Sequence, residues 1–349
     1  MYFFFALILG DVYNTKQKIS TIKNDLKLQK LDLDIPANII PLGKFDNKFV
    51  YYLVEETKKE EISLTYFACD MTSDTSSMIF KTNDCFTVLG SALIKDKIIF
   101  AEVQREKLFY VELYTYSLEG VKTKVFEFET AFLPELNVVE ENLVISYAYW
   151  ENEKVMQQII QINLMNKEKR IIKEAEYVVN GTFCTGILLD GIKATEEGVL
   201  FQQIIFENDE MFRDESGKTE IVFYDNKKKK DKILFKLPFK VCYIGGSEDY
   251  IITNQYAYAM PLDETGKIYS KMMLGYMAYT ISDISSVNDI KDSWVFEKNL
   301  IIQSFYNTYI VDMKSLETSV ISDTKYSCIN DCNLIICRNN GDICMLDLR

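Results

Sequence analysis

Short apolar runs recur along this chain at a regular interval, and each run is opened by a polar residue or a glycine. An acidic residue stands one or two places before most of these openings. The runs begin near positions 49, 98, 143, 199, 250, 300 and 334, so the interval is about 50 residues and shortens only at the last copy. The seven opening residues are Lys48, Lys97, Asn142, Gly198, Asp249, Asn299 and Asn333. A repeat of this length, built from short apolar runs, predicts a repetitive all-β architecture.

Each repeat contains four strand-like segments, and the second repeat shows them most clearly. A small, apolar segment at 86–93 is followed by an apolar one at 98–103, an alternating one at 108–116 and a charged one at 122–129. This order is expected when the first strands are sandwiched between neighbouring sheets and the last strand faces water. Short polar turns, most of them containing Gly or Asn, join the third segment to the fourth.

These repeats predict a seven-bladed β-propeller of four-stranded antiparallel blades, forming one domain over residues 1–349. The last repeat supplies only three strands, which are 325–329, 334–337 and 343–348. The segment 25–34 contains alternating leucines, and we expect it to close the ring as the missing fourth strand beside 343–348. For residues 1–24 two interpretations stay open, a signal-peptide remnant and an extra strand.

The repeat resembles that of generic bacterial β-propellers, in which each blade carries an aromatic strand start and a Leu-Tyr or Tyr-x-Val-Asp strand. The residues that carry the resemblance are Phe-Val-Tyr-Tyr at 49–52, Leu-Phe-Tyr at 108–110 and Tyr-Ile-Val-Asp at 309–312. The Gly-His and Trp-Asp pairs of WD repeats and the paired glycines of kelch repeats are absent. At 263–266 a glycine stands one place too late for the Asp box of sialidase-like propellers. The resemblance therefore implies a fold and no particular activity.

The composition excludes several classes of function. The net charge is −13, whereas nucleic acid or an anionic membrane would require a basic surface. The lysine run at 227–230 lies between two strand-like segments and is interpreted as a solvated turn. Histidine is absent, which excludes a Ser-His-Asp triad, a His-ligated metal and an imidazole proton shuttle. We expect no metal, no cofactor and no nucleic-acid partner.

The eight cysteines do not match a metal site. The last four, Cys328, Cys332, Cys337 and Cys344, follow the spacing Cys-x3-Cys-x4-Cys-x6-Cys, whereas zinc sites usually combine two close pairs. Asn340-Gly341 predicts a two-residue hairpin that places Cys337 opposite Cys344. A disulfide between these two cysteines stays open, because a hydrogen-bonded pair holds its side chains farther apart.

The sequence does not indicate a cellular compartment. No stretch approaches roughly 18 consecutive apolar residues, so we expect no membrane span. The apolar opening at 1–9 has the length of a secretory core but lacks a basic n-region and a small-residue cleavage site. Cytoplasmic and extracytoplasmic locations therefore both stay open.

The candidate site lies on the face where the loops between second and third strands emerge. The loop at 207–217 is the longest of them and lengthens its repeat by about eight residues, and long loops in compact folds are often functional. Trp150 is one of two tryptophans and stands in the corresponding loop of the preceding repeat. The candidate ligand-binding residues are Trp150, Glu153, Glu207, Asp209, Glu210, Phe212 and Arg213. The alternative is that these loops are only solvated hairpin tips.

Two functions follow as hypotheses. The first is a monomeric, non-catalytic scaffold that binds a protein, peptide or glycan on one propeller face, since no catalytic motif is present. The second is a carbohydrate-active enzyme that uses Asp or Glu, with Tyr, in the central funnel. Carboxylates from first strands of different blades would favour the enzyme if they converge on the axis, and an apolar or water-filled axis would favour the scaffold.

Overall fold

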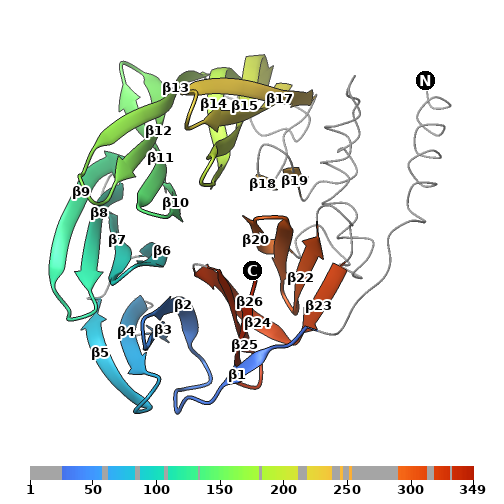
Figure 1. Ribbon diagram of the computed structural model, residues 1–349. Coiled ribbons are helices and arrows are strands. Elements are labelled where there is room, and N and C mark those ends of the chain that lie inside the picture. The colour runs from blue at the N-terminus through green and yellow to red at the C-terminus, as the bar shows by residue number, and fades with distance from the viewer. Residues whose placement is uncertain are drawn as a thin grey trace, which may run out of the picture.

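The protein folds into a ring of antiparallel β-sheets around a central axis (Figure 1). The computed structural model describes residues 26–56, 62–82, 87–105, 109–132, 134–180, 183–210, 218–237, 244–246, 251–253, 290–312, 318–330 and 332–349. Every regular element among these residues is a strand. The chain is therefore an all-β β-propeller of four-stranded sheets, as the repeat predicts.

Six second strands begin where the sequence places them, and the seventh predicted opening, Asp249, lies outside the described residues. These strands are β3 (Lys48–Glu56), β7 (Lys97–Arg105), β11 (Asn142–Glu151), β15 (Gly198–Glu210), β21 (Asn299–Ser304) and β25 (Asn333–Arg338). A short turn precedes each one, and the first turn residue has a left-handed φ of 50° at Asp46, 52° at Lys95 and 51° at Glu140. The polar residues in front of each apolar run are thus the turns between first and second strands.

The other strands complete the sheets in sequence order. The first strands are β2 (Ile40–Phe45), β6 (Thr87–Ile94), β10 (Glu135–Val139), β14 (Phe183–Ala194), β20 (Ile290–Phe296) and β24 (Thr324–Asn330). The third strands are β4 (Ile62–Asp70), β8 (Phe109–Ser117), β12 (Lys154–Asn163), β16 (Lys218–Asp225), β22 (Asn307–Asp312) and β26 (Ile343–Asp347). The outer strands are β5 (Thr75–Lys81), β9 (Lys122–Thr130), β13 (Lys169–Asn180), β17 (Lys230–Leu237), β23 (Thr318–Ser322) and β1 (Gln29–Leu31). A shorter pair, β18 (Ile244–Gly246) and β19 (Ile251–Thr253), lies between the sheets that begin with β14 and β20 (Figure 1).

Apolar side chains of neighbouring sheets pack together and form the core. Tyr66 and Phe80 of one sheet contact Phe100 and Tyr116 of the next, with the rings of Phe80 and Tyr116 stacked at 3.6 Å between centroids. The outer strand β9 instead exposes Lys122, Thr123 and Lys124 and its other charged side chains. This change from buried inner strands to a charged outer strand confirms the gradient within the repeat.

Strands from distant parts of the sequence meet in one sheet. β1 pairs with β26 so that Gln29 lies opposite Met345 and Leu31 opposite Ile343. Leu26 and Leu28 pack on the core on one side of this sheet. Leu31 and Leu33 pack on the other side. The predicted pairing beside 343–348 is confirmed, whereas residues 1–24 lie outside the described residues.

The predicted two-residue hairpin at Asn340-Gly341 is wrong. Cys337 lies opposite Ile343 and Cys344 opposite Ile336, and Gly341 takes the left-handed φ of 89° in a longer turn closed by Arg338 and Asp342. The extra turn residue shifts the register by one position, which directs the two sulfurs to opposite faces of the sheet. Both cysteines are free thiols, so no disulfide joins them.

The described residues contain neither a membrane-spanning helix nor a cluster of metal ligands. No helix among them is long and apolar enough to cross a membrane. No group of three or more Cys, Asp or Glu side chains in the same part of the chain is arranged to hold a metal ion.

Candidate functional site

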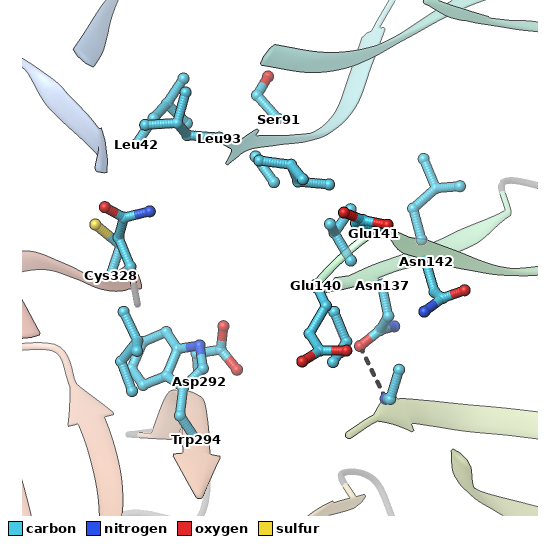
Figure 2. Close-up of a pocket in the computed structure, with 18 of the residues that line it drawn as sticks. Leu42, Ser91, Leu93, Asn137, Glu140, Glu141, Asn142, Asp292, Trp294 and Cys328 are labelled. Carbon is cyan, nitrogen blue, oxygen red and sulfur yellow. Dashed lines mark hydrogen bonds between the residues drawn. The ribbon is translucent and has the colours of Figure 1, made fainter. Parts of the chain in front are cut away.

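A cavity of about 1180 Å³ occupies the axis of the ring. Its walls come from the first strands β2, β6, β10, β14, β20 and β24 and from the turns that follow several of them. Figure 2 shows residues of β20 and β10 on opposite sides of this space, among them Trp294 and Asn137. Because consecutive strands are antiparallel, these turns emerge on the face opposite to the loops between second and third strands.

Two ion pairs connect different sheets along the cavity wall. Lys95, in the turn after β6, pairs with Glu141, in the turn after β10. Lys193 of β14 pairs with Asp292 of β20 at 2.6 Å between Nζ and Oδ1. The Lys193 ammonium also lies 5.8 Å from the Trp294 ring centroid, within the range of a cation–π contact. These contacts connect separate sheets where the wall is polar.

Acidic side chains outnumber lysines on the cavity wall. The charged lining residues are Lys95, Lys193, Glu140, Glu141, Glu196 and Asp292, so the wall carries a net charge of −2. Glu140 and Glu196 are exposed, and no lysine or arginine of the described residues pairs with either. Further acids stand in the equivalent turns around the ring, including Asp46, Asp96 and Glu297. The mouth of the cavity is therefore negatively charged, which attracts cations from solution.

Glu135 and Asp190 form a carboxylate pair between the first strands β10 and β14. The Glu135 carboxylate accepts hydrogen bonds from the backbone N–H of Ile192 at 2.8 Å and of Gly191 at 3.4 Å. Burial raises the pKa of Glu135, these N–H groups oppose the rise, and the neighbouring Asp190 adds to it. Neither carboxylate lines the cavity, and both help to hold the irregular backbone of β14.

The raised pKa of Glu135 predicts a specific pH effect. A carboxyl group with a raised pKa in the folded state stabilises the fold at low pH and loses that contribution as the pH rises through the folded pKa. Glu135→Gln keeps an acceptor for Ile192 and removes the charge, so we expect it to be more stable than the parent at pH 8 and equal at pH 4. Urea denaturation at both pH values checks this, with Glu135→Ala as a control that loses stability at both. A stability difference independent of pH would contradict it.

The potential nucleophiles in the cavity are held neutral. Burial raises the pKa of Tyr52 to about 12, with smaller contributions from Tyr326 and Cys328. Burial also raises the pKa of the Cys328 thiol far above its usual range, with Cys337 adding to the effect. The half-buried Cys328 thiol therefore stays protonated, and the thiolate is the reactive form.

The predicted residues Trp150 and Glu153 lie on the opposite face from the cavity mouth. Trp150 is near the end of β11 and 54% exposed, as expected for a side chain near a loop. Asn152 and Glu153 form a tight turn with φ values of 48° and 67°. An exposed tryptophan at this position is available for contact with a ligand.

The predicted loop at 207–217 is shorter than the sequence suggests. Glu207, Asp209 and Glu210 belong to β15, where they lie opposite Thr185, Cys184 and Phe183 of β14. The beginning of β14 pairs with this extension of β15 on one side. On its other side it pairs with β13, which joins β10–β17 into one sheet. The interpretation of these three acids as loop residues is therefore wrong. Phe212 and Arg213 lie outside the described residues.

Comparisons with known proteins support the fold alone. No family model and no curated protein sequence matches the chain. Acylaminoacyl peptidase from Pyrococcus horikoshii is similar in structure, with a TM-score of 0.51 and 12% identity over 85% of this chain and 48% of that protein. The propeller domain of the Trilobed protease from Pyrococcus furiosus gives a TM-score of 0.46 and 12% identity over 90% of each chain. TolB from Acinetobacter baumannii gives 0.39 and 14% identity over 88% of this chain and 65% of that one.

The ring of four-stranded antiparallel sheets defines the chain as a β-propeller. No family within that class is assigned, since all the identities are low. The chain spans about half the length of the acylaminoacyl peptidase that it resembles.

Proposed function

We propose that this chain is a non-catalytic binding scaffold whose central cavity receives a positively charged segment of a protein or peptide. The observation that carries the proposal is the axial cavity of about 1180 Å³, whose wall carries a net charge of −2. A cavity of this size admits several side chains. A lysine or arginine entering it can reach Glu140 and Glu196, which the lysines of the wall leave unpaired.

The state of four groups in the cavity supports a non-catalytic role. Lys95 and Lys193 are bound in ion pairs, which stabilise the charged ammonium form rather than a nucleophilic amine. Tyr52 and Cys328 are neutral at physiological pH because burial raises the pKa of each. The wall therefore offers charge and shape for binding, and none of these four side chains is activated as a base or nucleophile.

We also propose that the ring contains seven blades. Four sheets have four strands each, the eight-stranded sheet β10–β17 supplies two further sets of four, and the pair β18–β19 lies between β14 and β20, in the position of another blade. The spacing of the repeats supports this count, since the opening at Asp249 lies midway between those at Gly198 and Asn299.

Charge reversal at the cavity mouth tests the proposed function. We expect a dye-labelled tetralysine peptide to bind and Glu140→Lys/Glu196→Lys to weaken binding roughly tenfold, because about 1.4 kcal/mol is lost. The matched control is Glu153→Lys, which changes an acid in a turn of the same left-handed kind on the opposite face. Fluorescence anisotropy measures both, and added salt should weaken binding by screening.

The same experiment also tests binding on the face that carries Trp150. The prediction that ligands contact the face of Trp150 stays open, and it requires Glu153→Lys rather than Glu140→Lys/Glu196→Lys to reduce binding. Equal affinity of tetralysine and tetraglutamate for the parent protein would contradict an acidic site on either face.

A carbohydrate-active enzyme is the second candidate. Glu135 and Asp190, which come from two first strands, are the carboxylate pair to be considered for it. Glycoside hydrolysis requires carboxyl groups about 5–10 Å apart. Hydrogen-bonded carboxyl groups are closer, at roughly 2.5–3 Å between oxygens. We therefore expect no product when oligosaccharides are incubated with the protein and analysed by mass spectrometry, and product that disappears in Asp190→Asn would support the enzyme.

A further inference from the structure

Two lysines and three aromatic side chains gather on the face opposite to the cavity mouth. We call Lys291, Phe305, Tyr306, Lys325 and Tyr326 the lysine–aromatic cluster. Lys291 is on β20, Lys325 and Tyr326 are at the start of β24, and the other two residues lie in the turn between β21 and β22. None of the five lines the cavity.

Cation–π contacts connect the members of the cluster. The Lys291 ammonium lies 4.8 Å from the Phe305 ring centroid and 5.7 Å from that of Tyr326. The Lys325 ammonium lies 5.5 Å from the Tyr326 centroid. Both ammonium groups therefore lie within cation–π range of the Tyr326 ring, so two positive charges adjoin the same side chain.

This charge is not neutralised within the described residues. No carboxylate among them forms an ion pair with Lys291 or Lys325, and Lys291 Nζ donates only to the backbone oxygen of Lys325 at 3.4 Å. Burial lowers the pKa of Lys291, and the neighbouring charge of Lys325 lowers it further. An anion between the two ammonium groups would relieve this repulsion.

The turn that carries the exposed rings is already ordered. Ser304 Oγ accepts a hydrogen bond from the backbone N–H of Asn307 at 3.0 Å, and the backbone N–H of Thr324 donates to the carbonyl of Tyr306 at 2.8 Å. Tyr306 and Phe305 nevertheless expose 73% and 47% of their surface. Because the backbone of this turn is already ordered, less conformational entropy is lost when a ligand packs on its exposed rings.

We propose that the lysine–aromatic cluster binds an aromatic carboxylate, with the carboxylate between Lys291 and Lys325 and the ring against Tyr306. This chemistry occurs in free aromatic acids and at the carboxyl terminus of a peptide that ends in Phe, Tyr or Trp. The site is independent of the central cavity, since it has the opposite charge and lies on the opposite face.

Ligand-detected NMR titration with N-acetylphenylalanine tests this site. We expect binding of the acid and at least tenfold weaker binding of N-acetylphenylalanine amide, which has the same ring and no charge. Lys291→Gln/Lys325→Gln should lower the affinity for the acid at least tenfold. The matched control is Lys169→Gln, because Lys169 also lies over a ring, that of Phe126 at 5.0 Å, on another sheet. It should bind like the parent.

The role of the rings is tested separately with Tyr306→Ala. Tyr306 is exposed, so this variant keeps its fold, and a severalfold loss of affinity supports the site. A peptide Ala-Ala-Ala-Phe with a free carboxyl terminus distinguishes the two sources: tighter binding than N-acetylphenylalanine indicates a peptide terminus, and equal or weaker binding indicates a free acid. Equal binding of acid and amide, or full affinity in Lys291→Gln/Lys325→Gln, would overturn the proposal.

Discussion

Removal of residues 1–34 will lower the melting temperature of this protein by roughly 5 °C or more. The deletion takes away β1 and with it the outer strand beside β26. It also removes Leu26, Leu28, Leu31 and Leu33, which pack on the core on both sides of that sheet. Four half-buried leucines stabilise the fold by roughly 4 kcal/mol, a large share of the total of about 5–15 kcal/mol for a native protein. Circular dichroism during heating measures the change.

Point variants within β1 separate this effect from the loss of chain length. Leu31→Asp places a charge against the core and should destabilise the protein by on the order of 3 kcal/mol. Gln29→Asp alters an exposed position of the same strand and should leave the melting temperature nearly unchanged. A truncated protein that melts like the parent would show that β1 does not stabilise the ring.

Gly198→Ala will destabilise the protein by about 3 kcal/mol or more. Gly198 opens β15, and a Cβ atom there would lie 2.0 Å from the backbone oxygen of Tyr224 and 2.6 Å from the Phe223 ring. The Tyr224 oxygen belongs to the paired strand β16, so it cannot move without disturbing the sheet. Urea denaturation measures the loss.

The equivalent position in another sheet provides the control. Lys97 opens β7 as Gly198 opens β15, and it already carries a side chain, so Lys97→Ala should change the stability by less than about 0.5 kcal/mol. A Gly198→Ala variant as stable as the parent would mean that the strands approach less closely than the structure indicates.

The fold was predictable because local pattern and global architecture agree. Each apolar run opened by a polar residue became the buried second strand of a sheet, as at Lys48 and Asn142. The register at Cys337 and Cys344 was not predictable, since Asn-Gly fits two hairpin lengths and only the packing of the strands distinguishes them. The same limit applies to β15, whose acidic end becomes a strand only because β14 lies beside it.

The sequence shows the acids of the cavity mouth but not that they lie together. An acidic residue precedes most of the apolar runs in the sequence, and in the ring the turns that carry these acids surround one mouth, with Glu140 and Glu196 on the cavity wall. Residues that recur once per repeat are far apart in sequence and meet only when the ring forms. The pairing of Glu135 with Asp190 has no such signal, because it depends on the irregular backbone of β14.

The two tryptophans provide the most direct test of the central cavity as the binding site. Trp294 lines the cavity, and Trp150 is exposed on the opposite face. In Trp150→Phe only Trp294 emits, and in Trp294→Phe only Trp150 emits. Titration with tetralysine should change the emission of Trp294, because the peptide competes with Lys193 for Asp292 beside the indole, and should leave that of Trp150 unchanged. A response from Trp150 with none from Trp294 would contradict binding in the cavity.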